Sequence, residues 1–203
     1  MKLGNFVALE PGSYFIDPDA DPSTPLRVVF DVPVSGWSQW MGAVKGGGGG
    51  HVMVSITTVP NLVRHGCRNH APADPAVGPS VDDLATALAT LAPFRVTTPP
   101  ENVTVYGYSG KHLEWAVPRN MQYDGEGFPG CADDDLESWM SPNNGPPGDN
   151  TYRGYEGPGD SEEFWILDVD GTRLVIVAGR SPGSPSQDLS EMQAILDSIR
   201  IEP

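Results

Sequence analysis

The sequence predicts an α+β fold, in which an antiparallel β-sheet is packed by two main amphipathic helices at about residues 80–92 and 186–200. Three observations support this class. Short β-branched or aromatic runs are separated by turns rich in Gly and Pro. Two segments carry apolar residues at helical spacing. The strands come in groups and do not alternate with helices as a parallel sheet would require.

Four extended segments precede the first helix. The runs at 12–17, 26–33 and 51–60 read as strands that end at Pro or in loop sequence, and 37–45 reads as a fourth. Five consecutive glycines at 46–50 follow that fourth strand. Because glycine loses the most backbone entropy on ordering, we expect a flexible connection there.

The first helix has a recognisable beginning and end. Ser80 is a favourable N-cap, acidic residues fill the positive first turn, and Pro93 stops the helix. Two strands then flank the tripeptide at 108–110 in a predicted hairpin. Residues 119–160 are rich in Gly, Pro, Asp and Asn, which predicts a long irregular loop.

The last quarter predicts two strands joined at Asp170-Gly171, followed by the second helix. The alternation of a strand places Trp165, Leu167 and Val169 on one face of the sheet. Ile166 lies on the other face together with Asp168, whose carboxylate therefore needs solvent or a partner.

Composition indicates one domain spanning 1–203 and limits its partners. The 203 residues include 12 Lys and Arg against 27 Asp and Glu, a net charge of −15. Such a field disfavours nucleic acid and anionic membranes. No apolar run reaches the length of a membrane span, and we expect no membrane insertion of this segment, no cofactor, and a monomer.

Cys67 and Cys131 lie in loop sequence, and acidic composition with few cysteines is typical of a secreted domain with one disulfide. The alternative is two free thiols. Cys67 also stands between His65 and His70, which would suit zinc, but a bridge to Cys131 would remove the thiolate that such a site needs. We expect His51 and His112, which lie in strand patterns, to be structural.

Two motifs resemble catalytic signatures. The run from Asp168 to Thr172 matches the DxDGT motif of haloacid-dehalogenase-type phosphatases. That chemistry needs a later Lys and a helix after the motif, but no Lys follows Lys111 and the next segment has strand character. The run GYSGK around Ser109 departs from the GxSxG nucleophile elbow in its final glycine. We therefore interpret both as hairpin turns and expect no catalytic residue.

Two loop features are candidate binding sites. Asp17, Asp19 and Asp21 imitate the start of a calcium-binding loop, although the Gly and the final Glu of that motif are missing, so they are weak metal candidates. The loop at 119–160 collects aromatic and acidic residues that predict a recognition surface. This predicted surface comprises Trp139, Tyr123, Tyr152, Tyr155, Asp133, Asp134 and Asp135. In the alternative interpretation, the aromatic rings pack the loop onto the sheet.

The arrangement of several motifs resembles a group of actinobacterial extracytoplasmic proteins of unknown function. The motifs are GSY, VPVSGW, a Cys in the loop after the next strand, PSVDDLATALATL, VTVYGYSGKHLEWAVP, a second Cys, FWILDVDGTRLVIVAG and EMQAILDSIRI. These lipoprotein or membrane-tethered domains are distantly similar to the PsbP/Mog1-like fold of the LpqN lipoproteins. The resemblance implies a PsbP/Mog1-like sandwich and an export route, without implying a reaction.

The function expected from the sequence is an extracytoplasmic binding or sensor module without catalytic activity, secreted or tethered to the envelope through a segment missing here. Its partner would be an unknown protein or a small ligand. Two alternatives remain open: a secreted hydrolase with a non-local active site, and a structural domain of a larger envelope protein.

Overall fold

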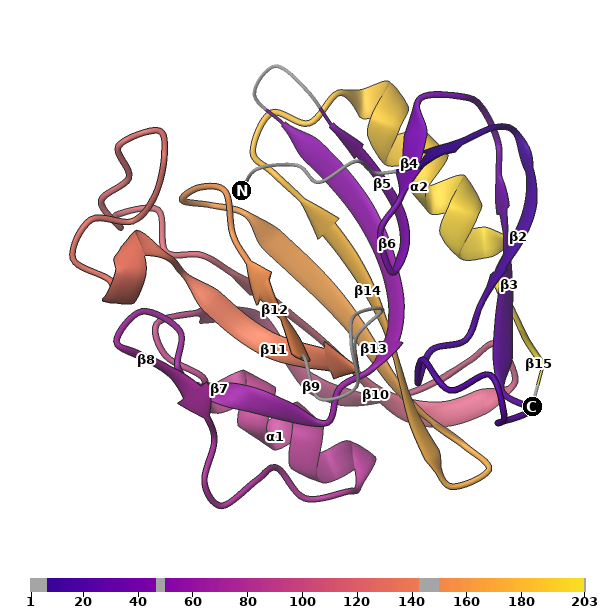
Figure 1. Ribbon diagram of the computed structural model, residues 1–203, viewed down its shortest axis with the longest axis horizontal. Coiled ribbons are helices and arrows are strands. Elements are labelled where there is room, and N and C mark those ends of the chain that lie inside the picture. The colour runs from indigo at the N-terminus through magenta and orange to yellow at the C-terminus, as the bar shows by residue number, and fades with distance from the viewer. Residues whose placement is uncertain (1–6, 47–49, 143–149, 203) are drawn as a thin grey trace.

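The structure is a computed structural model that describes residues 7–46, 50–142 and 150–202. Within these residues an eight-stranded antiparallel sheet crosses the centre of the molecule (Figure 1). Its strands, in spatial order, are β1 (Ala8–Leu9), β4 (Trp37–Gln39), β5 (Gly42–Gly46), β6 (His51–Thr58), β14 (Thr172–Arg180), β13 (Ser161–Val169), β10 (Tyr108–Ala116) and β9 (Arg95–Val105).

Different elements cover the two faces of this sheet. One face packs against α1 (Val81–Thr90) and a four-stranded sheet, whose order is β12 (Asn150–Gly154), β11 (Glu137–Pro142), β7 (Asn61–His65) and β8 (Asn69–Pro72). The other face packs against α2 (Ser186–Asp197) and a three-stranded sheet, whose order is β15 (Arg200–Glu202), β3 (Arg27–Val32) and β2 (Gly12–Ile16). A 3-10 turn, η1 (Ala132–Asp134), precedes β11.

The expectation of an α+β sheet packed by two main helices is wrong, because the protein is a β-rich sandwich. Strands make up 48% of the described chain and helical residues 14%. The two helices exist, but each shares its face with a further sheet. The sequence signal failed because the strands of the four-stranded sheet are short and interrupted by turn residues, so their pairing is decided by contacts distant in sequence.

The predicted loop at 119–160 contains β11 and β12 in its described part. The predicted flexible connection at 46–50 falls mainly outside the described residues, since 47–49 are not among them, while Gly46 ends β5. The strand predicted at 37–45 is divided into β4 and β5 at Met41, whose φ is 46°. The second helix ends at Asp197 rather than near residue 200, and the next residues pair with β3 as β15.

The start of the first helix was predicted correctly, because it depends on residues that are neighbours in sequence. Ser80 caps α1 through a capping box, in which its Oγ accepts from the Asp83 backbone N–H at 3.0 Å and the Asp83 carboxylate accepts from the Ser80 N–H. Pro99 and Pro100 lie within β9, which is tolerated because β9 is an edge strand.

Candidate functional site

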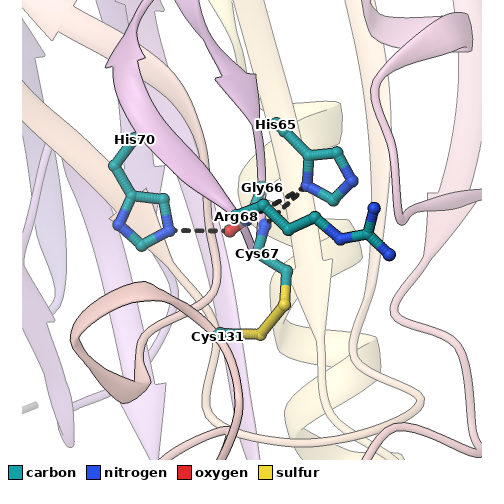
Figure 2. Close-up of a disulfide and its surroundings, with 6 residues drawn as sticks. All are labelled: His65, Gly66, Cys67, Arg68, His70 and Cys131. Atoms are coloured by element: carbon teal, nitrogen blue, oxygen red, sulfur yellow. Dashed lines mark hydrogen bonds between the residues drawn. A yellow bond between two sulfur atoms is a disulfide. The ribbon is translucent and has the colours of Figure 1, made fainter.

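The disulfide predicted between Cys67 and Cys131 is present (Figure 2). The imidazoles of His65 and His70 lie on opposite sides of the bridge and hydrogen-bond to backbone. His65 Nδ1 accepts from the N–H of Cys67 at 3.1 Å, and His70 Nε2 lies 2.9 Å from the Gly66 carbonyl oxygen. The bridge removes the Cys67 thiolate, so the zinc alternative at this loop loses its strongest ligand.

The DxDGT run forms a hairpin turn, as predicted. Asp170 and Gly171 both have positive φ, 49° and 88°, as a type I′ turn requires. Asp168 is exposed, and its Oδ1 accepts from the Gly171 N–H at 2.9 Å, so the partner that this carboxylate needs lies within the turn. Leu167 and Ile166 belong to opposite faces of the sheet, as the alternation predicted.

The GYSGK motif around Ser109 also lies in a hairpin. The turn is two residues earlier than predicted, at Tyr106-Gly107. Ser109 lies exposed within β10 and has no strand-to-helix elbow around it. Gly110 is required by close approach of the neighbouring strand, since a Cβ there would lie 2.0 Å from the Ile166 carbonyl oxygen.

The predicted recognition surface is divided by the fold. Trp139 is fully buried and Tyr155 is 8% exposed, so both belong to the hydrophobic core rather than to a surface. Tyr152 is half-buried against the same core. Tyr123 and the three aspartates at 133–135 remain exposed, and for these four residues a role in recognition stays a prediction.

The three aspartates of the first acidic loop do not converge on a common point. Asp17 pairs with Arg27 at 3.2 Å, whereas Asp19 and Asp21 accept hydrogen bonds from backbone and hydroxyl groups of their own loop. The hydrogen bonds from Ser23 lower the pKa of Asp21. The hydrogen bonds that Asp19 and Asp21 accept within the loop stabilise its turns.

An open groove of about 1130 Å³ lies at one end of the central sheet. Its floor comes from the ends of β9, β10, β13 and β14, and its rim from the loops that follow β10 and β14. We call this the arginine groove. Its lining residues are Arg95, Val96, Thr97, Glu114, Ala116, Val117, Pro118, Arg119, Asn120, Gly159, Ser161, Arg180, Ser181 and Pro182.

Three of the 12 basic residues of the chain line this groove. Arg95, Arg119 and Arg180 are exposed, and none of them forms an ion pair with another described residue. Arg180 Nε donates to Ser161 Oγ at 3.3 Å, and its remaining donors are available. One carboxylate, Glu114, lines the same groove, so positive charge predominates. Sequence patterns gave no signal for this grouping, because the arginines are distant in sequence.

A serine and a histidine meet at the rim of the groove. Ser181 Oγ lies 2.6 Å from Nδ1 of His51, which is 7% exposed. The Glu156 carboxylate approaches the same nitrogen at 3.3 Å, and the hydrogen bond from His51 lowers the pKa of Glu156. In a catalytic triad the acid and the nucleophile bind different ring nitrogens, so this arrangement departs from that geometry.

These features define a β-rich sandwich protein whose described residues include an open, mainly cationic groove. In the described part of the chain, no helix is both long and apolar enough to cross a membrane. No protein-family model matches the chain, and no curated protein matches it significantly.

Among solved structures, the chain is similar to LpqN of Mycobacterium tuberculosis, described as involved in cell envelope biogenesis. The identity is 12%, the TM-score is 0.44, and the match covers 94% of this chain and 92% of that chain.

Proposed function

We propose that this protein is an extracytoplasmic, non-catalytic module that binds a small ligand bearing carboxylate or phosphate groups in the arginine groove. The observation that carries the proposal is the grouping of Arg95, Arg119 and Arg180 without ion-pair partners among the described residues. Arginine suits such a ligand because its planar guanidinium binds carboxylate or phosphate through paired hydrogen bonds.

The negative net charge of the protein strengthens the argument from the three arginines of the groove. A protein of net charge −15 repels anions over most of its surface, so an anion binds only where local positive charge exceeds that field. Several basic side chains elsewhere form ion pairs, as Arg153 does with Glu162 and Lys45 does with Asp188. The groove therefore brings together three arginines that lack ion-pair partners among the described residues.

The disulfide supports the proposed location. Structural disulfides form and persist in secreted and periplasmic compartments and are rare in the reducing cytosol. Cys67 and Cys131 are joined, and both pack against the core, so the bridge is a structural one.

Isothermal titration calorimetry of the tag-free protein with citrate and with inorganic phosphate tests the proposal. We expect saturable binding of at least one of them. Changing Arg95, Arg119 or Arg180 to Gln should weaken it by about 10-fold or more, because a hydrogen bond to a charged group contributes about 1.5–3 kcal/mol.

Arg68→Gln is the matched control, since Arg68 is an exposed arginine outside the groove. It removes the same charge from the protein, and we expect unchanged affinity. The absence of saturable binding for both anions, or an equal loss in the control, would contradict the proposal.

Ester hydrolysis by Ser181 is the second candidate, favoured by its 2.6 Å contact with His51 at the groove rim. The assay is hydrolysis of p-nitrophenyl acetate by the wild type and by Ser181→Ala. For a binding module we expect the same background rate in both proteins. A wild-type rate that is lost in Ser181→Ala would instead establish the hydrolase.

A further inference from the structure

A second cluster of polar side chains lies on the same face of the central sheet as the arginine groove. His112, Glu114 and Glu163 place one ligating atom each within 4.8 Å of one another, and all three residues are half-buried. Glu114 also lines the groove, so the cluster and the groove adjoin. No other group of three such side chains in the described chain lies as close together.

The register of the strands brings these residues together. His112 and Glu114 are two residues apart on β10 and therefore share a face of the sheet. Glu163 on β13 lies directly opposite Glu114 and diagonal to His112. The ladder between β10 and β9 is irregular on both sides of Glu114, and such bulges re-aim side chains and are frequent near functional sites.

A cation between Glu114 and Glu163 would relieve the repulsion between their carboxylates. Like charges directly opposite each other on neighbouring strands destabilise a sheet. Among the described residues, neither Glu114 nor Glu163 pairs with a Lys or Arg, although Glu163 contacts His112. A divalent ion would neutralise both carboxylates.

A further carboxylate orients the imidazole. Glu101 on β9 lies 3.3 Å from Nδ1 of His112, and Glu163 lies 2.8 Å from Nε2. Metal-binding histidines usually donate their second ring N–H to a carboxylate, which selects the tautomer with a free lone pair on the metal side. The His112 ring is 13% exposed and also packs against Trp165, with ring centroids 5.6 Å apart.

We propose that His112, Glu114 and Glu163 bind one divalent transition-metal ion of the Zn²⁺ class, with Glu101 as a positioning residue. An imidazole with carboxylates suits Zn²⁺ better than Ca²⁺ or Mg²⁺, which prefer oxygen ligands alone. Ligands on tetrahedral Zn²⁺ stand about 3.4 Å apart. The Glu163 oxygen, now 2.8 Å from His112 Nε2, must therefore move away from the ring, and the ligand atoms that lie farther apart must move closer. Three protein ligands leave one coordination position open. The site does not depend on the proposed anion binding.

The test is calorimetric titration of tag-free, chelator-treated protein with ZnCl₂ in buffer without phosphate or citrate. We expect one Zn²⁺ per chain. Glu163→Gln, Glu114→Gln and His112→Gln should each weaken binding by about 100-fold or more, exceeding the roughly 10–100-fold typical for loss of an outer-shell partner. Glu126→Gln is the matched control, because Glu126 is exposed and outside the cluster.

The positioning role of Glu101 is tested by measuring the coordination geometry of the bound ion as well as its affinity. With Co²⁺ as the probe, Glu101→Gln should change the visible absorption of the bound ion and weaken binding about 10-fold, and Glu101→Asp should restore part of both.

Far-UV circular dichroism establishes that each variant is folded. Absence of saturable Zn²⁺ binding to the wild type would overturn the proposal, because the cluster would then be an ion pair between His112 and its carboxylates. Zn²⁺ binding that persists unchanged in both Glu163→Gln and His112→Gln would overturn it equally, since the ion would occupy another place.

Discussion

Glu162 is a carboxylate with 1% exposure, held inside the core between the central and four-stranded sheets. Its oxygens accept hydrogen bonds from four donors: Nε1 of Trp115 and of Trp139 at 3.3 and 3.2 Å, the Tyr155 hydroxyl at 2.7 Å, and Nε of Arg153 at 2.5 Å. A buried charge is tolerated only when it is paired and hydrogen-bonded, and here both conditions hold.

The network shifts the pKa values of Arg153 and Tyr155. Burial alone would lower the pKa of Arg153, but the Glu162 carboxylate more than compensates and raises it above its ordinary value. Burial and the charge of Glu162 raise the pKa of Tyr155 well above its ordinary value, so the phenol remains a donor. The guanidinium also lies 4.7 Å from the centroid of the Tyr155 ring.

At this scale we predict that Glu162→Gln lowers the free energy of unfolding by about 3–5 kcal/mol, because it leaves the Arg153 charge buried without a counter-ion. Urea denaturation followed by tryptophan fluorescence measures the change. The exposed Glu126→Gln should change stability by less than about 0.5 kcal/mol. A loss under about 1 kcal/mol for Glu162→Gln would show that Arg153 does not depend on this carboxylate.

Among the elements, the β13–β14 hairpin is the one most completely specified by its own residues. The middle parts of both strands are apolar on two faces because the strands lie in the middle of the sheet, with layers packed on either side. The turn adopts positive φ at both central positions, which Asp and Gly tolerate. A Cβ at Gly171 would meet no atom within 4 Å, so its only cost is backbone strain.

At the element scale we predict that Gly171→Ala lowers the free energy of unfolding by about 1–2 kcal/mol through that strain. Asp170→Gly should be neutral or slightly stabilising, since glycine favours the same conformation. Gly157→Ala is the control, because Gly157 is also open to a Cβ but lacks the positive φ. Equal effects of the two Ala substitutions in urea denaturation would contradict the assignment to strain.

At the scale of the whole molecule, the disulfide joins two segments that carry the four-stranded sheet. Cys67 follows β7, and Cys131 precedes η1 and β11, 64 residues later. Backbone hydrogen bonds run alongside the bridge, from the Ala132 N–H to the Cys67 carbonyl at 2.7 Å and from the Glu137 N–H to the Gly66 carbonyl at 2.9 Å.

We predict that replacing both cysteines with serine lowers the free energy of unfolding by about 4 kcal/mol, the loop-closure value for such a separation in the chain-entropy model. Urea denaturation of the double variant gives the change, and the wild type in reducing agent provides an independent comparison. If the free energy of unfolding falls by less than about 1 kcal/mol in both the double variant and the reduced wild type, the hydrogen bonds beside the bridge are sufficient to keep the two segments together.

The binding candidates show why turns were predicted correctly while the surface placement of Trp139 and Tyr155 was wrong. Trp139 and Tyr155 lie in sequence rich in turn residues, which placed them on a surface, but they enter the core because β11 pairs with β7 and Glu162 provides a buried acceptor. No sequence pattern groups the three arginines of the groove, Arg95, Arg119 and Arg180. They share a groove because β9, β10, β13 and β14 are neighbours or near neighbours in one sheet.

The sequence by itself determined the features that depend on a few neighbouring residues or on composition: the capping box at Ser80, the Asp170-Gly171 turn, the alternation along β13, and the Cys67–Cys131 pair. Tertiary structure alone decided the β-rich sandwich, the burial of Glu162, the arginine groove and the His112 cluster. Each of these requires strands distant in sequence to pair, and pairing energy comes from cross-strand and core contacts that no local pattern encodes.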